Sequence, residues 1–310
     1  MSALETRALE QCLACGSRRL ARVAMRYDWQ GRSFPAARCR DCGMIFLRVQ
    51  PAGATLAHMY SAEYFEQDFR CGRSDAVATD EAAFRAENDG LLEQFETWRA
   101  EGRLLEIGCA TGLLLKRARE RGWRTTGVEL SPDAVAHARA LGLDVRQGTL
   151  SDAALPDDSF DVVYMGDVLE HVPDCHATLA EVARVLAPGG RAVVRGPITT
   201  HSLARRVGLA IHGAFGGCIV LREPPYHLWE FRPASLARLA RGVGLEVESL
   251  EQSKIPPGRP HGRKSALEGL AMRALDTVNA PLTRSFNILG DRAVLVARKA
   301  ARPAGMGERK

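Results

Sequence analysis

The chain has 310 residues and a net charge of +5, with 46% apolar and 25% charged residues. Its length suits one large domain plus a small one, and its ordinary composition excludes a low-complexity protein. The modest charge permits anionic partners but does not demand nucleic acid. No apolar run approaches the roughly 20 residues that span a bilayer, and the N-terminus lacks a signal-peptide pattern. We therefore expect a cytoplasmic protein with no transmembrane segment.

Residues 1–50 contain four of the eight cysteines, as two Cys-x-x-Cys pairs that are each followed by glycine: Cys12 and Cys15, then Cys39 and Cys42. Two such pairs supply four thiolates for a tetrahedral zinc ion, and a reducing compartment favours metal over disulfides. Because the protein would supply all four ligands, the zinc would stabilise a segment with too little core to fold alone. Iron, free thiols and a lost metal site are the alternatives.

The chain after residue 50 divides into a helical connector, 51–100, and a long region, 101–299, in which strands and helices alternate. The expected strands are Arg103–Ile107, Thr125–Leu130, 143–147, Phe160–Met165, 191–196, a strand before Gln252, and Asp291–Lys299. This alternation predicts an α/β fold with a doubly wound, mostly parallel sheet of seven strands, covered on both faces. Residues 197–232 interrupt the rhythm and are interpreted as an inserted lid, and residues 300–310 as a disordered tail.

A glycine turn follows the first expected strand, with small residues at Gly108, Ala110 and Gly112. Such residues let the backbone approach a ligand closely. Glu106, at the mouth of the turn, would repel a pyrophosphate and attract a cation. Glu129 ends the second strand 21 residues after Gly108, where a carboxylate can accept both ribose hydroxyls. The pattern favours S-adenosylmethionine; NAD and a turn without ligand are the alternatives.

Four motifs in order, LLEIGCATGLLL, GVELSP, FDVVYMGDVLEHVPD and EVARVLAPGGRAVV, resemble those of class I S-adenosylmethionine-dependent methyltransferases. The resemblance is closest to the branch with LEH after the fourth strand, which includes ubiquinone-type and many small-molecule methyltransferases. It covers residues 100–197 closely and 226–299 loosely, and implies a Rossmann-like methyltransferase core behind a small zinc-ribbon-like module.

The resemblance also implies roles for individual residues. Glu106, Gly108, Ala110 and Gly112 would border the methionine part of the cofactor, and Glu129 would bind the ribose. Leu130 would lie against the adenine, with Thr149 and Leu150 at its edge and Asp167 beside the methyl donor. Thr149 stands where an Asp is common, so Asp152 or a backbone carbonyl is expected to meet the adenine amine instead.

The candidate catalytic residues are His171, after the fourth strand, and Tyr226 and His227, in an aromatic segment that would cover the site. A proton acceptor is often needed for methyl transfer, and histidine is the commonest one. A structural hydrogen bond for His171 and a packed lid for His227 are the alternatives. Tyr60 or Tyr64 is also expected to reach the site.

The cysteine pairs, YSAEYF and the Tyr-His segment also look like nucleotide-sugar C-methyltransferases, which usually carry a further C-terminal domain. We therefore expect methyl transfer to a small-molecule acceptor, such as a sugar, a glycan precursor or a natural product. An RNA methyltransferase that grips RNA with the zinc module is the alternative, and a non-catalytic scaffold is a third reading. Basic residues are interspersed with acidic ones, so nucleic acid is not the expected partner. The acceptor atom and the oligomeric state stay open.

Overall fold

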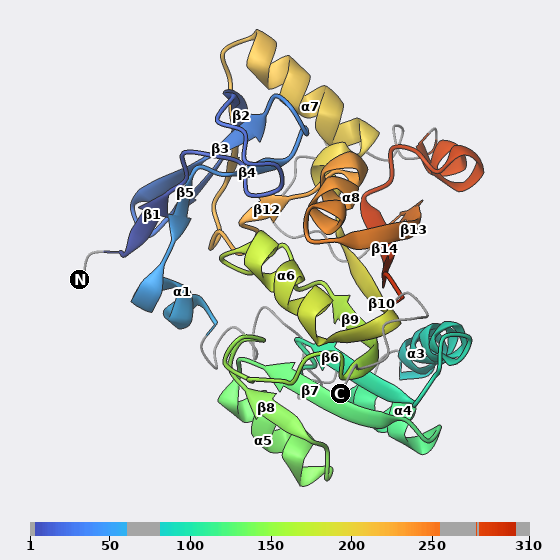
Figure 1. Cartoon of the computed structure of the whole chain (residues 1–310). Coiled ribbons are helices and arrows are strands. Elements are labelled where there is room, and N and C mark those ends of the chain that lie inside the picture. The colour runs from blue at the N-terminus through green and yellow to red at the C-terminus, as the bar shows by residue number, and fades with distance from the viewer. Residues whose placement is uncertain (1–3, 61–80, 255–276, 278, 302–310) are drawn as a thin grey trace, which may run out of the picture.

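The computed structural model describes residues 4–60, 81–254, 277 and 279–301. Three sheets organise these residues: a seven-stranded sheet, a five-stranded sheet that lies above it in Figure 1, and a two-stranded sheet at the start of the chain. Tyr64, the basic stretch 258–264 and most of the expected tail lie outside the described residues. Within the described ranges, no helix is both long and apolar enough to cross a membrane.

The large sheet confirms the predicted architecture. Its strands lie in the order β13-β14-β10-β9-β6-β7-β8, and only β14 runs antiparallel to its neighbours. In chain order they are β6 (Arg103–Ile107), β7 (Arg124–Glu129), β8 (Val145–Gln147), β9 (Phe160–Gly166), β10 (Leu186–Pro197), β13 (Leu245–Ser253) and β14 (Arg292–Lys299). The carboxyl ends of β6, β7 and β9 meet at one edge, where ligands bind in open α/β sheets.

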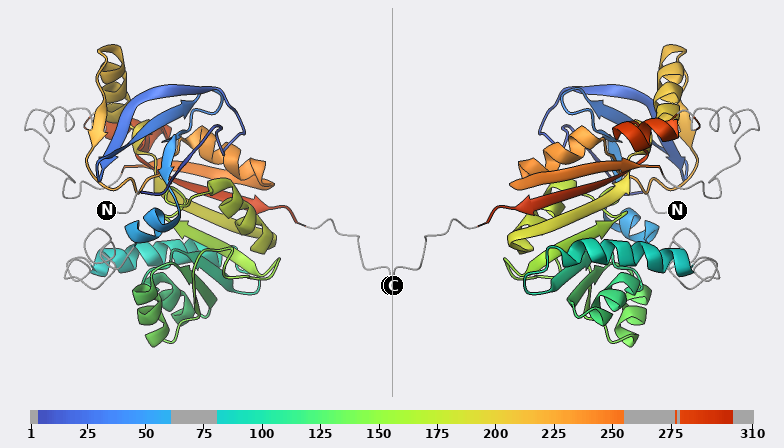
Figure 2. Two further views of the ribbon diagram at one scale, coloured as in Figure 1. Left: turned by 90° about the vertical axis from the view of Figure 1, so that its left-hand side faces the viewer. Right: turned by 90° about the vertical axis from the view of Figure 1, so that its right-hand side faces the viewer.

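Helices cover both faces of this sheet (Figure 2). They are α3 (Glu81–Glu96), α4 (Leu113–Glu120), α5 (Pro132–Ala140), α6 (Cys175–Val185) and α8 (Pro233–Gly242). Successive strand residues point to opposite faces, so Leu104 packs in one core with Leu92 of α3, whereas Leu105 packs in another with Leu179 of α6. These two cores fix the sheet between its helices.

The N-terminal module contains β1 (Thr6–Ala8), β2 (Leu20–Trp29), β3 (Arg32–Cys39), β4 (Ile45–Leu47), β5 (Val49–Pro51) and the short helix α1 (Gly53–Met59). Its five-stranded sheet has the order β11-β2-β3-β4-β12, and both edge strands come from the insertion 197–232. That insertion comprises the single turn η2 (Thr199–His201), α7 (Leu203–Ala214), β11 (Ile219–Leu221) and β12 (Trp229–Glu230). The insertion is therefore built into the sheet of the N-terminal module.

Candidate functional site

The glycine turn after β6 depends on backbone conformations that most side chains disfavour. Gly108, Ala110 and Gly112 have φ values of 69°, 47° and 78°. A Cβ at Gly112 would lie 2.5 Å from Leu143 Cδ1, and one at Gly108 would overlap the side chain of Val168. The turn therefore requires residues without side chains at Gly108 and Gly112. Val168, in the segment after β9, packs directly against the turn at Gly108.

Two buried carboxylates lie beside this turn. Glu129 accepts hydrogen bonds from the backbone N–H groups of Ala110 and Ser131, both at 2.9 Å. Glu106 is buried, and its Oε2 has no hydrogen-bond partner among the residues that the structure describes. Burial raises the pKa of Glu129, and burial together with the charge of Glu129 raises the pKa of Glu106 well above its usual range. A buried acceptor with no partner is costly, so this pair of carboxylates is suited to receive a cation.

The residues predicted to contact the adenine, Leu130, Thr149 and Leu150, differ in their exposure to solvent. Leu130 is 49% exposed although it is apolar, and Leu150 is buried. The Thr149 backbone N–H and hydroxyl both donate to Asp152 Oδ2, at 2.9 and 2.6 Å. Asp152 therefore closes the loop after β8, and an exposed apolar side chain stands next to Glu129.

Asp167 follows β9 in a left-handed conformation, with φ 55°. Its two carboxylate oxygens accept from Arg292 Nη2, both at 2.7 Å, and its backbone N–H donates to the Arg195 carbonyl at 2.8 Å. Arg292 therefore fixes the carboxylate of Asp167. The placement of Asp167 beside the methyl donor stays a prediction.

His171 lies three residues beyond Val168 and is surrounded by groups from distant segments. Its Nδ1 lies 3.0 Å from the Tyr226 carbonyl oxygen and 3.1 Å from the Tyr60 hydroxyl. The Tyr226 carbonyl can only accept, so Nδ1 carries the proton and Nε2 is left as an acceptor. Burial, followed by the charge of His227, lowers the pKa of His171 to about 3. The imidazole is thus neutral at physiological pH.

His227 packs edge-on against His171, with ring centroids 5.0 Å apart. Its Nδ1 lies 3.7 Å from Oε1 of the buried Glu230. Burial opposes the charged form of His227, but Glu230, Glu170 and Asp167 outweigh it and raise its pKa to about 9. Burial and the Asp167 charge raise the pKa of Glu170 to about 8. The site therefore pairs a neutral histidine with a cationic one.

Hydrogen bonds to backbone carbonyls hold the segment around His171 and the segment around His227 together. The Leu228 N–H donates to the Glu170 carbonyl at 2.9 Å, and Trp229 Nε1 donates to the Val172 carbonyl at 2.6 Å. The Leu228 carbonyl accepts from the Leu47 N–H of β4 at 3.0 Å. The N-terminal module thus supports the segment that carries His227.

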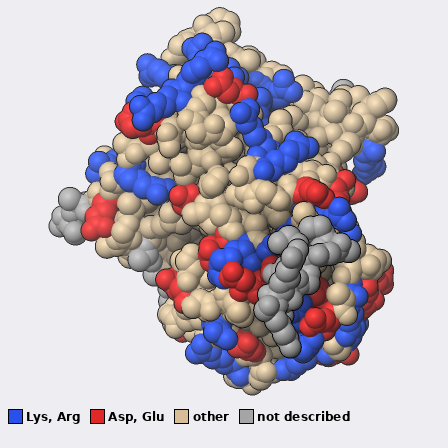
Figure 3. All heavy atoms as spheres, in the orientation of Figure 1, with Lys and Arg blue, Asp and Glu red and all other residues tan. Residues whose placement is uncertain are grey.

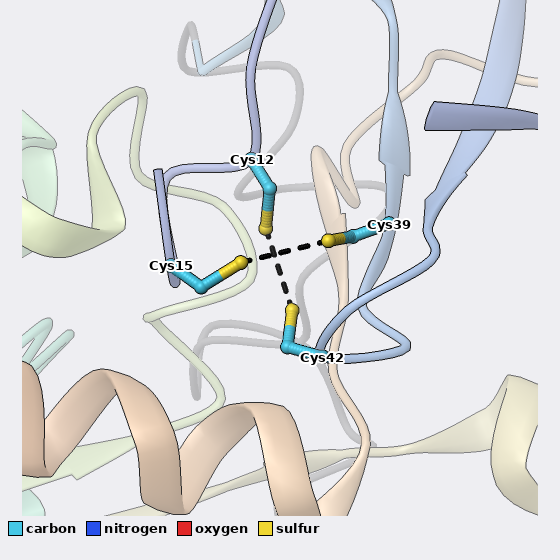
Figure 4. A group of neighbouring side chains, drawn as sticks. All are labelled: Cys12, Cys15, Cys39 and Cys42. Carbon is cyan, nitrogen blue, oxygen red and sulfur yellow. Dashed lines mark hydrogen bonds between the residues drawn. The ribbon is translucent and has the colours of Figure 1, made fainter. Parts of the chain in front are cut away.

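The four cysteines of the N-terminal module converge on one point (Figure 4). Their sulfurs lie within 4.8 Å of one another, with Cys12–Cys42 and Cys15–Cys39 separations of 3.5 Å. A tetrahedral zinc with bonds of about 2.3 Å places its sulfurs roughly 3.8 Å apart. In both turns the glycine N–H donates to the first cysteine carbonyl, at 2.7 Å for Gly16 and 3.0 Å for Gly43. The residues present fit zinc.

The structure brings together most of the residues that the sequence singled out. Glu106, Glu129 and the glycine turn form one group, and His171, Tyr226, His227 and Tyr60 form a second group beside it. Sequence reasoning missed Glu230, which is buried and accepts from the Thr199 hydroxyl at 3.0 Å. A signal was available, because Glu230 is a lone acid between the apolar Trp229 and Phe231.

The sheet order, the glycine turn and the paired carboxylates define a class I S-adenosylmethionine-dependent methyltransferase. A methyltransferase-domain family matches residues 80–250, and the chain belongs to that family. The N-terminal module lies outside this match.

Curated relatives agree with this assignment. The chain is 33% identical over 175 residues to a ubiquinone biosynthesis O-methyltransferase of Xanthomonas oryzae pv. oryzae, covering 54% of this chain and 72% of the relative. It is 31% identical over 172 residues to the protein of that name from Xylella fastidiosa, covering 53% and 69%. Among solved structures, a Thermotoga maritima S-adenosylmethionine-dependent methyltransferase, described as a possible histamine N-methyltransferase, is 21% identical, with a TM-score of 0.49 over 79% of this chain and 99% of that one.

Proposed function

We propose that this methyltransferase methylates a hydroxyl oxygen of a small-molecule acceptor. The observation that carries the proposal is the group formed by His171, which follows β9, with the partly exposed His227 and the buried Glu230. Val168, which packs against Gly108, joins this group to the turn expected to hold the methyl donor. Relatives named ubiquinone biosynthesis O-methyltransferase support oxygen as the acceptor atom. A sugar, a glycan precursor or another hydroxylated natural product fits the same chemistry.

Each residue has a part in this proposal. Bound S-adenosylmethionine supplies a methyl group activated by a sulfonium. His171 Nε2 accepts the hydroxyl proton late, once the forming oxygen–carbon bond has made the attacking oxygen strongly acidic, while the carbon–sulfur bond breaks with its electron pair left on sulfur. The His227 cation donates a hydrogen bond to the acceptor oxygen and orients it toward the methyl group. Glu230 keeps His227 protonated, and Tyr60 and the Tyr226 carbonyl orient His171.

The cofactor proposal assigns the residues beside the glycine turn. Glu106 would face the ammonium and sulfonium groups, and Glu129 would accept the ribose hydroxyls while it holds Ala110. Leu130 would cover the adenine, since its apolar surface is exposed beside Glu129.

We further propose that Cys12, Cys15, Cys39 and Cys42 bind one structural zinc. The supporting observation is the compact arrangement of the four sulfurs, which leaves no ligand position for a substrate. The zinc would stabilise the sheet that supports Leu228 and the neighbouring His227.

The test uses the full chain, methyl-labelled S-adenosylmethionine and a panel of hydroxylated acceptors. We expect label transfer by the wild type and by the control His137→Gln, because His137 is an exposed residue of α5. His171→Asn and His227→Gln should lower kcat by about 10²–10³-fold with little change in cofactor affinity. Transfer to RNA and to none of the small molecules would refute the proposal.

A further inference from the structure

Two side chains of the N-terminal module, Arg7 and Gln50, lie between the segments that carry His171 and His227. Arg7 in β1 and Gln50 in β5 are directly opposite each other in the antiparallel pairing of these two strands. Arg7 Nε and Nη2 donate to Gln50 Oε1 at 3.2 and 2.8 Å. We name this pair of side chains the polar bridge.

Each end of the polar bridge donates a hydrogen bond to a backbone carbonyl in one of the two segments. The guanidinium donates through Nη2 to the carbonyl of Pro173, two residues after His171. The amide donates through Nε2 to the carbonyl of Leu228, directly after His227, at 3.4 Å. The polar bridge therefore links the two segments through side chains from a third, distant part of the chain.

The partners of the Gln50 amide fix its orientation. A guanidinium can only donate and a carbonyl oxygen can only accept, so Oε1 faces Arg7 and Nε2 faces Leu228. Gln50 is fully buried, so both contacts are needed to satisfy its amide. Glutamate at this position could accept from Arg7 but could not donate to Leu228, and methionine could do neither. The two contacts can therefore be separated by substitution.

Arg7 differs from most arginines of the N-terminal module. Seven of the nine arginines in residues 1–60 are exposed, and Figure 3 shows Lys and Arg side chains gathered over this part of the surface. Arg7 is partly buried, and burial lowers its pKa, although the charge of Asp174 opposes this effect. Because a guanidinium stays charged in proteins, the acceptors that Arg7 contacts are what stabilise it in this place.

The polar bridge adds to the direct hydrogen bonds around His171. The carbonyls directly before and after His171 accept from the segment that carries His227. The polar bridge holds the next carbonyl along the chain, that of Pro173, and also the carbonyl directly after His227. The place of each imidazole ring therefore depends on donors that come from outside its own segment.

We propose that Arg7 and Gln50 are positioning residues that set the placement of His171 relative to His227. The inference rests on the proposed function, in which both histidines act on one acceptor hydroxyl. The two positioning residues act through backbone carbonyls, and a displacement of a reacting group by about 1 Å can lower a rate about 100-fold. Both lie outside residues 80–250, which match the methyltransferase family. The N-terminal module thus completes the arrangement of the active site.

Nuclear magnetic resonance of the full chain, labelled with nitrogen-15 histidine, tests this geometry without turnover. The His171 Nδ1 proton donates to the Tyr226 carbonyl at 3.0 Å, and its signal is assigned by its loss in His171→Asn. We expect this proton to exchange with water about tenfold faster in Gln50→Met and in Arg7→Met than in the wild type, because the loosened segment opens more often. Zinc content and S-adenosylmethionine affinity should stay at the wild-type values.

Gln50→Glu tests the contact with Leu228 alone, since glutamate still accepts from Arg7. The same faster exchange is expected, because the donor to the Leu228 carbonyl is lost. Two matched controls should behave like the wild type. They are Gln94→Met, an exposed residue of α3, and Arg48→Met, an exposed residue between β4 and β5.

A kinetic comparison separates this inference from the proposed function. With a hydroxylated acceptor that the wild type methylates, Gln50→Met and Arg7→Met should lower kcat about 10- to 100-fold, with KM for both substrates within about twofold. Faster exchange in the variants, with no hydroxyl methylated by the wild type, would refute the proposed function and support the polar bridge.

Two outcomes would overturn the inference. The first is wild-type exchange and wild-type kcat in both Gln50→Met and Arg7→Met. The second is a loss of S-adenosylmethionine affinity or of zinc that parallels the loss of kcat, which would make the polar bridge a general support of the fold. If Gln50→Met does not fold, Arg7→Met decides the question, because it leaves the Leu47 N–H donating to the Leu228 carbonyl.

Discussion

Replacing Glu106 with Gln gives a prediction with two opposite effects. Glu106 is 8% exposed, its Oε2 lacks a partner within the described part of the chain, and Glu129 lies beside it with a second negative charge. An unsatisfied buried group costs about 1–3 kcal/mol, and Gln removes the charge but keeps a polar atom. We therefore expect the cofactor-free variant to be more stable by about 1 kcal/mol at pH 8, a rise in Tm of about 2–4 °C.

The stability difference between Glu106→Gln and the wild type depends on pH. The pKa of Glu106 is higher in the folded than in the unfolded chain, so the folded state binds more protons. Wild-type stability therefore declines as the pH rises from the unfolded pKa through the folded one. The advantage of Glu106→Gln should be small near pH 5 and complete only above the folded pKa.

Although Glu106→Gln should stabilise the cofactor-free protein, it should weaken the binding of S-adenosylmethionine. Loss of a charge-assisted contact is worth about 1.5–3 kcal/mol, so S-adenosylmethionine should bind the variant about 10- to 100-fold more weakly. Thermal denaturation at two pH values and calorimetry measure both effects, with Glu93→Gln, an exposed residue of α3, as the control. A less stable variant with wild-type affinity would refute the reasoning.

Three further predictions follow from other parts of the structure. Cys39→Ser should lower the zinc content from about one per chain and destabilise the protein, as metal analysis and Tm would show; full zinc occupancy would remove the assignment. Gly108→Val should overlap Val168 and abolish cofactor binding by calorimetry, and retained affinity would contradict the turn geometry. The pKa of His227 is about 9, raised above 6.5, so His227 loses its positive charge as the pH passes 9. The methylation rate should therefore fall above pH 9. A rate that rises there would instead make His227 a base.

Local signals predicted the large sheet well. The sequence Ser131-Pro132-Asp133 is typical of a helix start, and the Ser131 hydroxyl accepts from the Ala134 N–H of α5 at 3.3 Å. The buried strands β6 and β9 are rich in apolar residues, and a glycine turn follows β6, so sequence patterns detect both strands. The Pro and Gly residues of APGG, at 187–190, are typical of a helix end, and α6 ends at Val185 just before them. The segment itself lies within β10, where the pairing with β9 shifts register between Leu186 and Arg191.

Non-local pairing explains what the sequence did not reveal. β11 and β12 have three and two residues, too few for any periodicity, and their partners lie in the N-terminal module. Without that pairing, Glu230 is one acid in an apolar stretch, far in the sequence from Ile45 of β4, with which it pairs. The fold brings them together only through contacts between segments that are far apart in the sequence.

Calorimetry of the full chain with S-adenosylmethionine and with NAD tests the central claim most directly, namely that two buried carboxylates select a cationic nucleoside. The structure predicts clear binding of S-adenosylmethionine, weakened about 10- to 100-fold by Glu129→Gln because Glu129 loses its charge toward the ribose hydroxyls, and no heat with NAD. Binding of NAD without binding of S-adenosylmethionine would contradict it.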